Sequence, residues 1–101
     1  MKHDYDGFDA IDDAVIRTER NKARVMRKSR WWQQKTASGV CWYCGRQVGG
    51  HNLTMDHVVP LTRGGRSTKD NLVPCCKECN NEKKSLLPME WEKTPQNKTS
   101  P

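Results

Sequence analysis

Apolar side chains recur at a loose helical spacing through the first third of the chain. From about residue 9 to residue 34 no Pro or Gly interrupts this pattern, which predicts a long helix. Aspartates gather at its start, where the helix dipole favours acids, and Ser38 with Gly39 is expected to end it. Residues 17–30 are too polar for a buried helix and predict one that lies along a surface or along a ligand.

Two adjacent tryptophans, Trp31 and Trp32, follow this polar stretch. We expect them to anchor the end of the helix to a folded domain, because large aromatic side chains supply much of the buried area in small cores. Stacking on nucleic-acid bases is their alternative role.

Farther along, short runs of apolar and β-branched residues predict strands. The predicted elements are residues 53–59 as a strand, residues 71–73 as a second strand, and residues 79–87 as a helix, with a glycine-containing loop over residues 61–70. A proline follows each of the three elements and cannot continue it, because proline lacks the backbone N–H. Short strands mixed with helices predict a small α+β fold.

The chain has 101 residues, enough for one small domain with tails. The predicted organisation is a flexible N-terminus over residues 1–8, a basic helical extension over 9–38, a metal-containing domain over 39–93 and a disordered tail over 94–101. Only 34% of the residues are hydrophobic, so the core is marginal by itself. A structural metal ion would supply the missing stability.

Positive charge is concentrated in the predicted N-terminal helix. The net charge is +6, but residues 14–38 alone contain eight Lys or Arg and one Glu, whereas residues 1–13 contain one Lys and five Asp. Such a segment favours a polyanionic partner, most simply nucleic acid. Arg24, Arg27 and Lys28 are candidate contacts. The alternative is an ordinary solvated helix face.

Four of the five cysteines form two C-x2-C pairs, Cys41 with Cys44 and Cys76 with Cys79. This spacing predicts a closed, tetrahedral, structural zinc site. Cys75 is left over, and we expect it to be a small buried side chain, although it could replace Cys76 in the metal site.

The cysteine pairs also bear on cellular location. The sequence contains no apolar run long enough for a signal peptide or a membrane span. We therefore expect an intracellular, cytoplasmic protein of a bacterial or phage-type setting, in which the thiols stay reduced and bind metal.

An Asp-His pair lies between the cysteine pairs, and its surroundings resemble the HNH endonucleases, also called His-Me or ββα-metal nucleases. The matching residues are Asp56-His57-Val58-Val59-Pro60-Leu61, Gly64-Gly65, Asn71-Leu72-Val73-Pro74, Cys76-x2-Cys79-Asn80 and Lys83. The resemblance covers roughly residues 40–87 and gives no support to residues 1–39. It implies the ββα-metal fold and hydrolysis of DNA to 5′-phosphate and 3′-hydroxyl products.

The resemblance also implies roles for four residues. His57 looks like the general base that takes a proton from the attacking water. Asp56 resembles the carboxylate that holds the single catalytic Mg²⁺ or Mn²⁺, with Asn80 standing where the family often has a second histidine. Asn71 resembles the residue that ties back the loop and orients His57.

The chemistry of these residue types fits the implied roles. Carboxylate and amide oxygens suit Mg²⁺ or Mn²⁺ better than zinc. A histidine with a pKa of about 6.5 can accept the proton of water. In a regular strand Asp56 and His57 would face opposite sides, so a strand end or a bulge must bring both to one phosphate.

Several basic residues near the motif are candidate phosphate contacts. Lys83 and Lys84 would stand near the metal-bound phosphate, because positions 80, 83 and 84 share a helix face. Arg63 and Arg66 of the glycine-containing loop could reach neighbouring phosphates. Each of these four residues could equally be an ordinary surface charge. Neither His51 nor His3 is expected to be catalytic.

Two further functional readings remain open. A non-catalytic zinc module for DNA or RNA needs the cysteines and the basic helix, but has no use for Asp56, His57 and Asn80 together. A zinc scaffold for protein partners leaves the basic segment unexplained. For the nuclease we expect DNA as the partner, no membrane and no small-molecule cofactor. A monomer would nick one strand, and a homodimer could cut both.

Overall fold

The structure, a computed structural model, describes residues 11–91. The predictions for residues 1–8 and 94–101 therefore lie outside the described residues. The elements in chain order are α2 (Asp13–Arg27), α3 (Arg30–Thr36), the 3₁₀ turn η1 (Gly50–Asn52), β1 (Leu53–His57), the 3₁₀ turn η2 (Leu61–Arg63), β2 (Leu72–Cys76) and α4 (Lys77–Lys83). Within the described residues, no helix has the length and apolar character that crossing a membrane requires.

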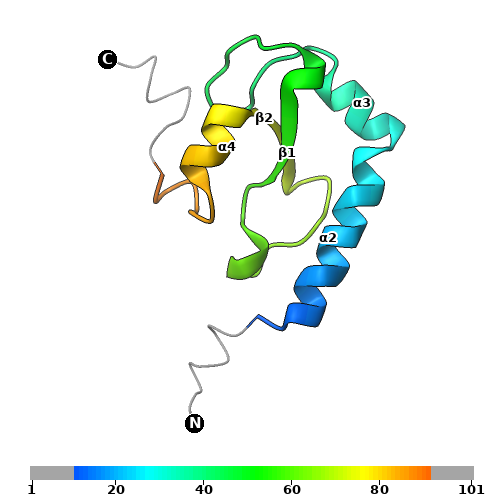
Figure 1. The fold of residues 1–101 in the computed structure, drawn as a ribbon, viewed down its shortest axis with the longest axis vertical. Coiled ribbons are helices and arrows are strands. Elements are labelled where there is room, and N and C mark those ends of the chain that lie inside the picture. The colour runs from blue at the N-terminus through cyan, green and yellow to red at the C-terminus, as the bar shows by residue number, and fades with distance from the viewer. Residues whose placement is uncertain (1–10, 92–101) are drawn as a thin grey trace.

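Strands β1 and β2 form a two-stranded antiparallel sheet in which Leu53 pairs with Cys76 and His57 with Leu72. In Figure 1 the sheet stands between α4 on one side and the α2–α3 pair on the other. All five residues of β2 are buried, whereas β1 is mostly half-buried. The predicted α+β architecture with two short strands is confirmed, with β1 ending two residues early and β2 extending to Cys76.

The core forms where β2, α4 and the first cysteine pair meet. Its buried members are Cys41, Tyr43, Val73, Cys75, Cys76, Cys79 and Trp91. Three of these seven side chains, Cys41, Cys76 and Cys79, belong to the C-x2-C pairs, so the candidate metal ligands themselves make up much of the core. A core of this composition is small for its chain length, and its cohesion depends on what the thiols bind.

The single N-terminal helix that the sequence predicts is in fact two helices. Helix α2 ends at Arg27, and α3 begins at Arg30 after the N-cap Ser29. The Ser29 hydroxyl donates to the carbonyl of Met26 at 2.6 Å and accepts from the N–H of Trp32 at 3.3 Å. A serine that bonds the backbone on both sides ends one helix and caps the next, which explains the break. Trp32 is buried, as expected for an anchor.

Helix α4 is displaced from its predicted range. It begins at Lys77, after Cys76 accepts the N–H of Cys79 through its sulfur, and it ends at Lys83 rather than near Leu87. At Lys84 the backbone turns to φ 50° and ψ −122°, and the N–H of Leu86 bonds the carbonyl of Lys83 at 2.9 Å. These are the angles of a type II′ turn, whose first central position favours glycine.

Glu19 attaches α2 to the loop between the strands. Its carboxylate accepts the N–H of Ser67 at 2.6 Å, the guanidinium of Arg66 at 3.2 Å and the ammonium of Lys22 at 3.1 Å. Glu19 is only 2% exposed. The Ser67 N–H, followed by Lys22 and Arg66, outweighs the effect of burial and lowers the pKa of Glu19 to about 2. The polar middle of the helix is thus buried at Glu19 and Ala23, against expectation.

This attachment predicts an acid-sensitive contribution to folding. The pKa of Glu19 is depressed in the folded chain, so its stabilisation is complete above the unfolded value of about 4.5. It is lost as pH falls from there toward about 2. The free energy of unfolding of the natural chain should therefore exceed that of Glu19→Gln near neutral pH, and the difference should shrink on acidification. Denaturant unfolding of both proteins at each pH measures it, and protonation of the cysteines cancels in the difference. A gap that does not vary with pH would contradict this assignment.

Candidate active site

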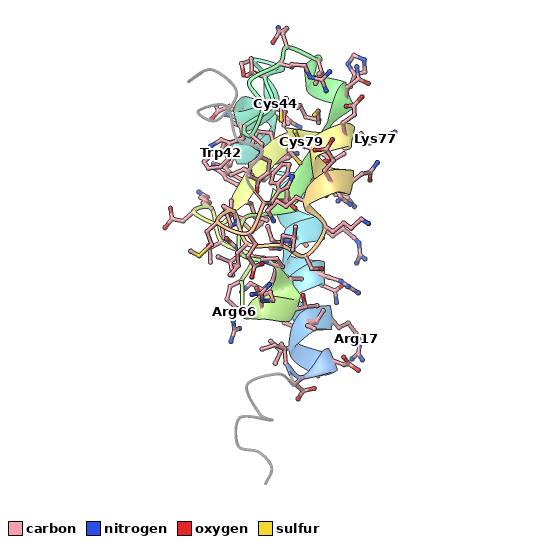
Figure 2. The ribbon with its side chains drawn as sticks, turned by 90° about the vertical axis from the view of Figure 1, so that its left-hand side faces the viewer. Arg17, Trp42, Cys44, Arg66, Lys77 and Cys79 are labelled. Atoms are coloured by element: carbon pink, nitrogen blue, oxygen red, sulfur yellow. The ribbon has the colours of Figure 1, made fainter. Side chains whose placement is uncertain are left out.

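The four paired cysteines converge to one point. The sulfurs of Cys41, Cys44, Cys76 and Cys79 all lie within 4.8 Å of one another, and Figure 2 shows Cys44 beside Cys79. Cys44 Sγ and Cys76 Sγ are 3.9 Å apart, close to the roughly 3.8 Å between sulfurs bound to one tetrahedral zinc at about 2.3 Å. The geometry fits a closed metal site.

Backbone and side-chain donors surround these sulfurs. The N–H groups of Cys44 and Cys79 point to the first sulfur of their own pairs at 3.4 and 3.5 Å, and Arg46 Nη2 approaches Cys76 Sγ at 3.5 Å. Such donors stabilise negative charge on thiolates. Cys75 lies apart from the cluster, fully buried, with its pKa raised to about 12 by burial. It is the small buried side chain that the sequence predicts.

Asp56 lies in a buried polar network on β1. Its Oδ2 accepts the hydroxyl of Tyr43 at 2.6 Å and the ammonium of Lys83 at 3.1 Å. Tyr43 and Lys83 are completely buried. Lys83 also donates to the carbonyl of His57 at 3.1 Å. Lys83 therefore holds Asp56 and the end of β1, and the expectation that it contacts phosphate is wrong in this structure, because its ammonium is enclosed.

His57 lies on the other side of the strand end. Its Nε2 is 2.9 Å from the hydroxyl of Ser67. Burial lowers the pKa of His57 below the ordinary value, against the opposite effect of the charges on Asp56 and Glu19. A lowered pKa keeps the imidazole neutral near pH 7, which is the form that can accept a proton.

The loop after His57 is closed by Asn71. The Asn71 side chain accepts the N–H of Val59 at 2.8 Å and donates to the carbonyls of Val59 at 3.0 Å and Arg66 at 2.8 Å. These bonds match the loop-tying role expected of Asn71. Gly65 lies so close to the carbonyl oxygen of Val59 that a Cβ there would collide with it, which accounts for the glycine in the motif.

Two cavities flank His57. The first, of about 220 Å³, is lined by Arg20, Met55, Asp56, His57, Pro60, Leu61, Thr62, Lys84 and Ser85. The second, of about 240 Å³, is lined by Arg20, Ala23, Arg24, Arg27, Met55 and His57. Asp56 and His57 thus border one cavity although they bond to opposite sides, because β1 ends at His57. The end of the strand therefore lets two residues that are adjacent in sequence reach one site.

Asn80 contacts β1 at Thr54, two residues before Asp56. Its amide nitrogen donates to Thr54 Oγ1 at 2.9 Å, and that hydroxyl donates to the carbonyl of Cys75 at 3.0 Å. Thr54 and Asp56 share a face of β1, because side chains two apart point the same way. Asn80 therefore contacts the face of β1 that carries Asp56, although it does not line the first cavity.

The basic residues named from the sequence fall into two groups. Lys84 lines the first cavity, and Arg24 and Arg27 line the second. Arg63 makes a bidentate ion pair with Glu90 at 2.9 Å for both bonds, and Arg66 pairs with Glu19, so a phosphate would have to compete for either. In Figure 2 Arg66 lies toward the end of the molecule away from the cysteines.

Sequence reasoning missed four residues that shape the site. They are Glu19, Arg20, Tyr43 and Ser67. Arg20 could have been found, since positions 20, 24 and 27 recur at helical spacing on one face. The other three depend on contacts between distant parts of the chain, for which the sequence carries no local signal.

Comparison with known proteins agrees with this geometry. The family model for HNH endonucleases matches residues 41–95, more than half of the chain. The chain belongs to the HNH endonuclease family. The matched region holds the cysteine cluster, both strands and α4, whereas α2 and α3 precede it.

Individual relatives match about half of the chain. The type IV methyl-directed restriction enzyme EcoKMcrA of Escherichia coli K12 is 35% identical over 57 residues, which cover 50% of this chain and 21% of the relative. A CRISPR-associated endonuclease Cas9 of Actinomyces naeslundii is 39% identical over 53 residues, 52% of this chain and 5% of the relative. The chain thus spans a minor part of either protein.

The fold has a counterpart among solved structures. The crystal structure of the type II-C Cas9 from Actinomyces naeslundii superposes with a TM-score of 0.50 at 21% identity, covering 78% of this chain and 10% of that one. At this identity the likeness supports the HNH fold and nothing finer.

The cysteine cluster predicts a sharp difference between neighbouring thiols. Cys44→Ser removes one sulfur from the cluster and should lose bound zinc together with cooperative folding, because metal binding supplies much of the stability of such domains. Cys75→Ala, the matched control, removes a thiol that lies apart from the cluster and should keep one zinc per chain. Elemental analysis and thermal unfolding measure both effects. Zinc retained by Cys44→Ser, or lost by Cys75→Ala, would contradict the assigned ligand set.

Proposed function

We propose that this protein is a metal-dependent endonuclease that hydrolyses DNA phosphodiester bonds at the cavity beside His57. The observation that carries the proposal is the meeting of Asp56, His57 and Lys84 at one cavity within an HNH family region. A carboxylate, a neutral imidazole and a cation are the groups that phosphodiester hydrolysis needs. DNA as the substrate is supported by the names of the relatives, a restriction enzyme and a CRISPR-associated endonuclease.

In this proposal His57 is the general base. Its imidazole accepts a proton from a water molecule in the cavity, and the resulting hydroxide attacks the phosphorus while the bond to the leaving oxygen breaks. The products carry a 5′-phosphate and a 3′-hydroxyl. Asn71 supports the step indirectly, since it fixes the loop that begins directly after His57.

A divalent cation, Mg²⁺ or Mn²⁺, would be held by Asp56 and Asn80. Both offer oxygen atoms, the donors these ions prefer, and both reach the same face of β1. When bound, such an ion stabilises negative charge on the phosphate and the leaving oxygen. Tyr43 and Lys83 hold the Asp56 carboxylate in place from the buried side.

The basic face of α2 is the proposed path of the neighbouring phosphates. Arg20, Arg24 and Arg27 line the second cavity together with His57, so a strand with its scissile phosphate at His57 would pass over them. Arginine suits this contact because its guanidinium binds phosphate through two bonds. Lys28 caps the end of the same helix.

A zinc module that binds nucleic acid without cutting it remains the second candidate. The basic face of α2 favours it, since binding alone would use those arginines. One HNH site acts on one strand at a time, so nicking by a monomer is the simplest form of the activity, and a homodimer would be needed to cut both strands together.

The nuclease proposal predicts loss of cleavage on removal of the imidazole. His57→Ala should lower the rate of plasmid nicking by roughly 10²–10⁴-fold, the usual contribution of a general base. Its zinc content should not change. Agarose gels of supercoiled plasmid with added Mg²⁺ or Mn²⁺ measure the rate, and omission of the added ion at constant zinc content should abolish it.

His51→Ala is the matched control for this prediction. His51 is an exposed histidine of η1, and its removal should leave the nicking rate intact. If the natural chain binds plasmid but never nicks it with any divalent ion, the binding module is correct. If His57→Ala nicks at the parental rate, the assigned base is wrong.

Substitution of Lys84 by glycine should change stability and activity in opposite directions. Its φ of 50° is one that glycine adopts without strain, yet a lysine stands there and lines the cavity. Lys84→Gly should raise the free energy of unfolding by about 1 kcal/mol through relief of backbone strain. It should also lower cleavage by at least about tenfold, since a hydrogen bond to a charged group contributes roughly 1.5–3 kcal/mol.

Two variants separate the causes. Lys84→Ala removes the ammonium but keeps the strained backbone, so it should lose activity without gaining stability. Lys77→Ala removes an exposed lysine at the other end of α4 and should change neither. Full activity in Lys84→Gly would remove Lys84 from the proposed site.

A further inference from the structure

The imidazole of His57 is held from a part of the chain that precedes the HNH region. His57 Nε2 lies 2.9 Å from Ser67 Oγ, and Ser67 is bonded in turn to Glu19 of α2. Glu19 and Ser67 are 2% and 3% exposed, so water does not compete for these bonds. One buried hydroxyl therefore joins α2 to the imidazole.

The directions of these bonds can be worked out from the atoms. A serine hydroxyl has a single hydrogen to donate. Ser67 Oγ lies 2.5 Å from the carbonyl oxygen of Glu19, an atom that can only accept, so the hydrogen points there. Ser67 Oγ must then accept a hydrogen from His57. The neutral imidazole consequently carries its hydrogen on Nε2 and its lone pair on Nδ1.

A second bond keeps the hydroxyl from turning. The N–H of Ser67 donates to Glu19 Oε1 at 2.6 Å, while Glu19 Oε2 accepts from Arg66 at 3.2 Å and from Lys22 at 3.1 Å. Glu19 thus grips Ser67 through both its carboxylate and its own backbone carbonyl. Rotation of the hydroxyl toward His57 would break its 2.5 Å bond to the Glu19 carbonyl, and a typical hydrogen bond of this kind contributes about 0.5–1.5 kcal/mol.

The other ring nitrogen faces no such partner. Among residues 11–91, no protein group forms a hydrogen bond with His57 Nδ1, whereas His57 lines both cavities. The lone pair that the Ser67 contact leaves on Nδ1 is thus the one that a water molecule in a cavity can reach.

We propose that Ser67, fixed by Glu19 of α2, is a positioning residue that holds His57 in the tautomer with its lone pair on Nδ1. This inference rests on the proposed function for the role of His57 as base. In the step it serves, the O–H bond of water breaks, the proton goes to Nδ1 and the electron pair stays on the oxygen that bonds phosphorus. The leaving oxygen then takes a proton from solvent.

The arrangement also links binding to catalysis. Arg20, next to Glu19 in sequence, lines both cavities, so the helix that would contact the substrate is the helix that sets the base. A substrate strand bound along α2 would contact the same helix that holds Ser67 in place through Glu19.

The tautomer can be measured without any substrate. Long-range proton–nitrogen NMR correlations of the zinc-loaded chain at about pH 8, where histidine is neutral, distinguish the two ring nitrogens. The natural chain should show His57 with its hydrogen on Nε2. Ser67→Ala should move the population toward the other tautomer, and Thr68→Ala, which removes the adjacent exposed hydroxyl, should not. A hydrogen on Nδ1 in the natural chain, or an unaltered spectrum in Ser67→Ala, would overturn the proposal.

Kinetics provide the second readout. Ser67→Ala keeps the N–H that bonds Glu19, so it should fold and keep its zinc. Its kcat should fall by roughly 10- to 100-fold, typical for loss of a group that orients a catalytic side chain, with KM unaltered because Ser67 is buried. Thr68→Ala should keep the parental kcat.

The two proposals fail in different ways. A chain that shows the expected tautomers but never cleaves DNA retains the positioning role and loses the nuclease function. A natural chain that cleaves, together with Ser67→Ala at the parental kcat, retains the function and loses the positioning role.

Discussion

The convergence of four thiols on one point is the constraint from which the rest of this structure follows. The core around them contains three of these cysteines, with Tyr43 and Trp91 in edge-on contact at 5.0 Å between ring centres. Apolar burial of this extent does not offset the conformational entropy of ordering some eighty residues. A metal bound to the cluster would fix β2 and α4 to the first cysteine pair, and β2 pairs in turn with β1, the strand that carries Asp56 and His57.

The Asp56 side chain is held in place by two buried side chains, Tyr43 and Lys83. A carboxylate that must face a cavity is fixed from behind by a phenol and an ammonium, both fully enclosed. Burial raises the pKa of Tyr43, and the nearby Asp56 raises it further, so the phenol stays a donor at any physiological pH. The lysine offsets the charge of a nearly buried acid, which would otherwise be costly. The Asp56 carboxylate is thus held in one position, as the proposed metal ligand would need to be.

The sequence predicts the parts of this molecule that depend on local pattern. The cysteine spacing and the existence of two short strands follow from residue types at fixed intervals, and the structure agrees. The expectation that Pro74 ends the second strand is wrong, because β2 continues through Pro74 to Cys76. The Asn71 loop closure was implied by the family resemblance. The break at Ser29 was missed because a serine inside a helical pattern signals an N-cap only when the preceding helix already ends. The depth of Lys83 was missed for a related reason. Each residue turns a helix by about 100°, so the spacing between Asn80 and Lys83 predicts that the two side chains lie near each other. It does not predict whether the Lys83 ammonium faces a phosphate or Asp56. Glu19 and Ser67 are 48 residues apart, and no local rule pairs them.

Helix α2 bears on how portable an HNH unit is. Sequence similarity begins at residue 41, yet the carbonyl that receives the Ser67 hydrogen belongs to residue 19. An HNH unit transferred to another protein from residue 41 onward would carry the cysteine cluster, both strands and α4. It would lack the Glu19 carbonyl, so the Ser67 hydrogen could turn toward the imidazole. A host that embedded this unit with its serine would need to supply an acceptor of its own at that position. The HNH region of this chain is thus not self-sufficient, because a segment outside it, the part of α2 that carries Glu19, completes the arrangement around His57.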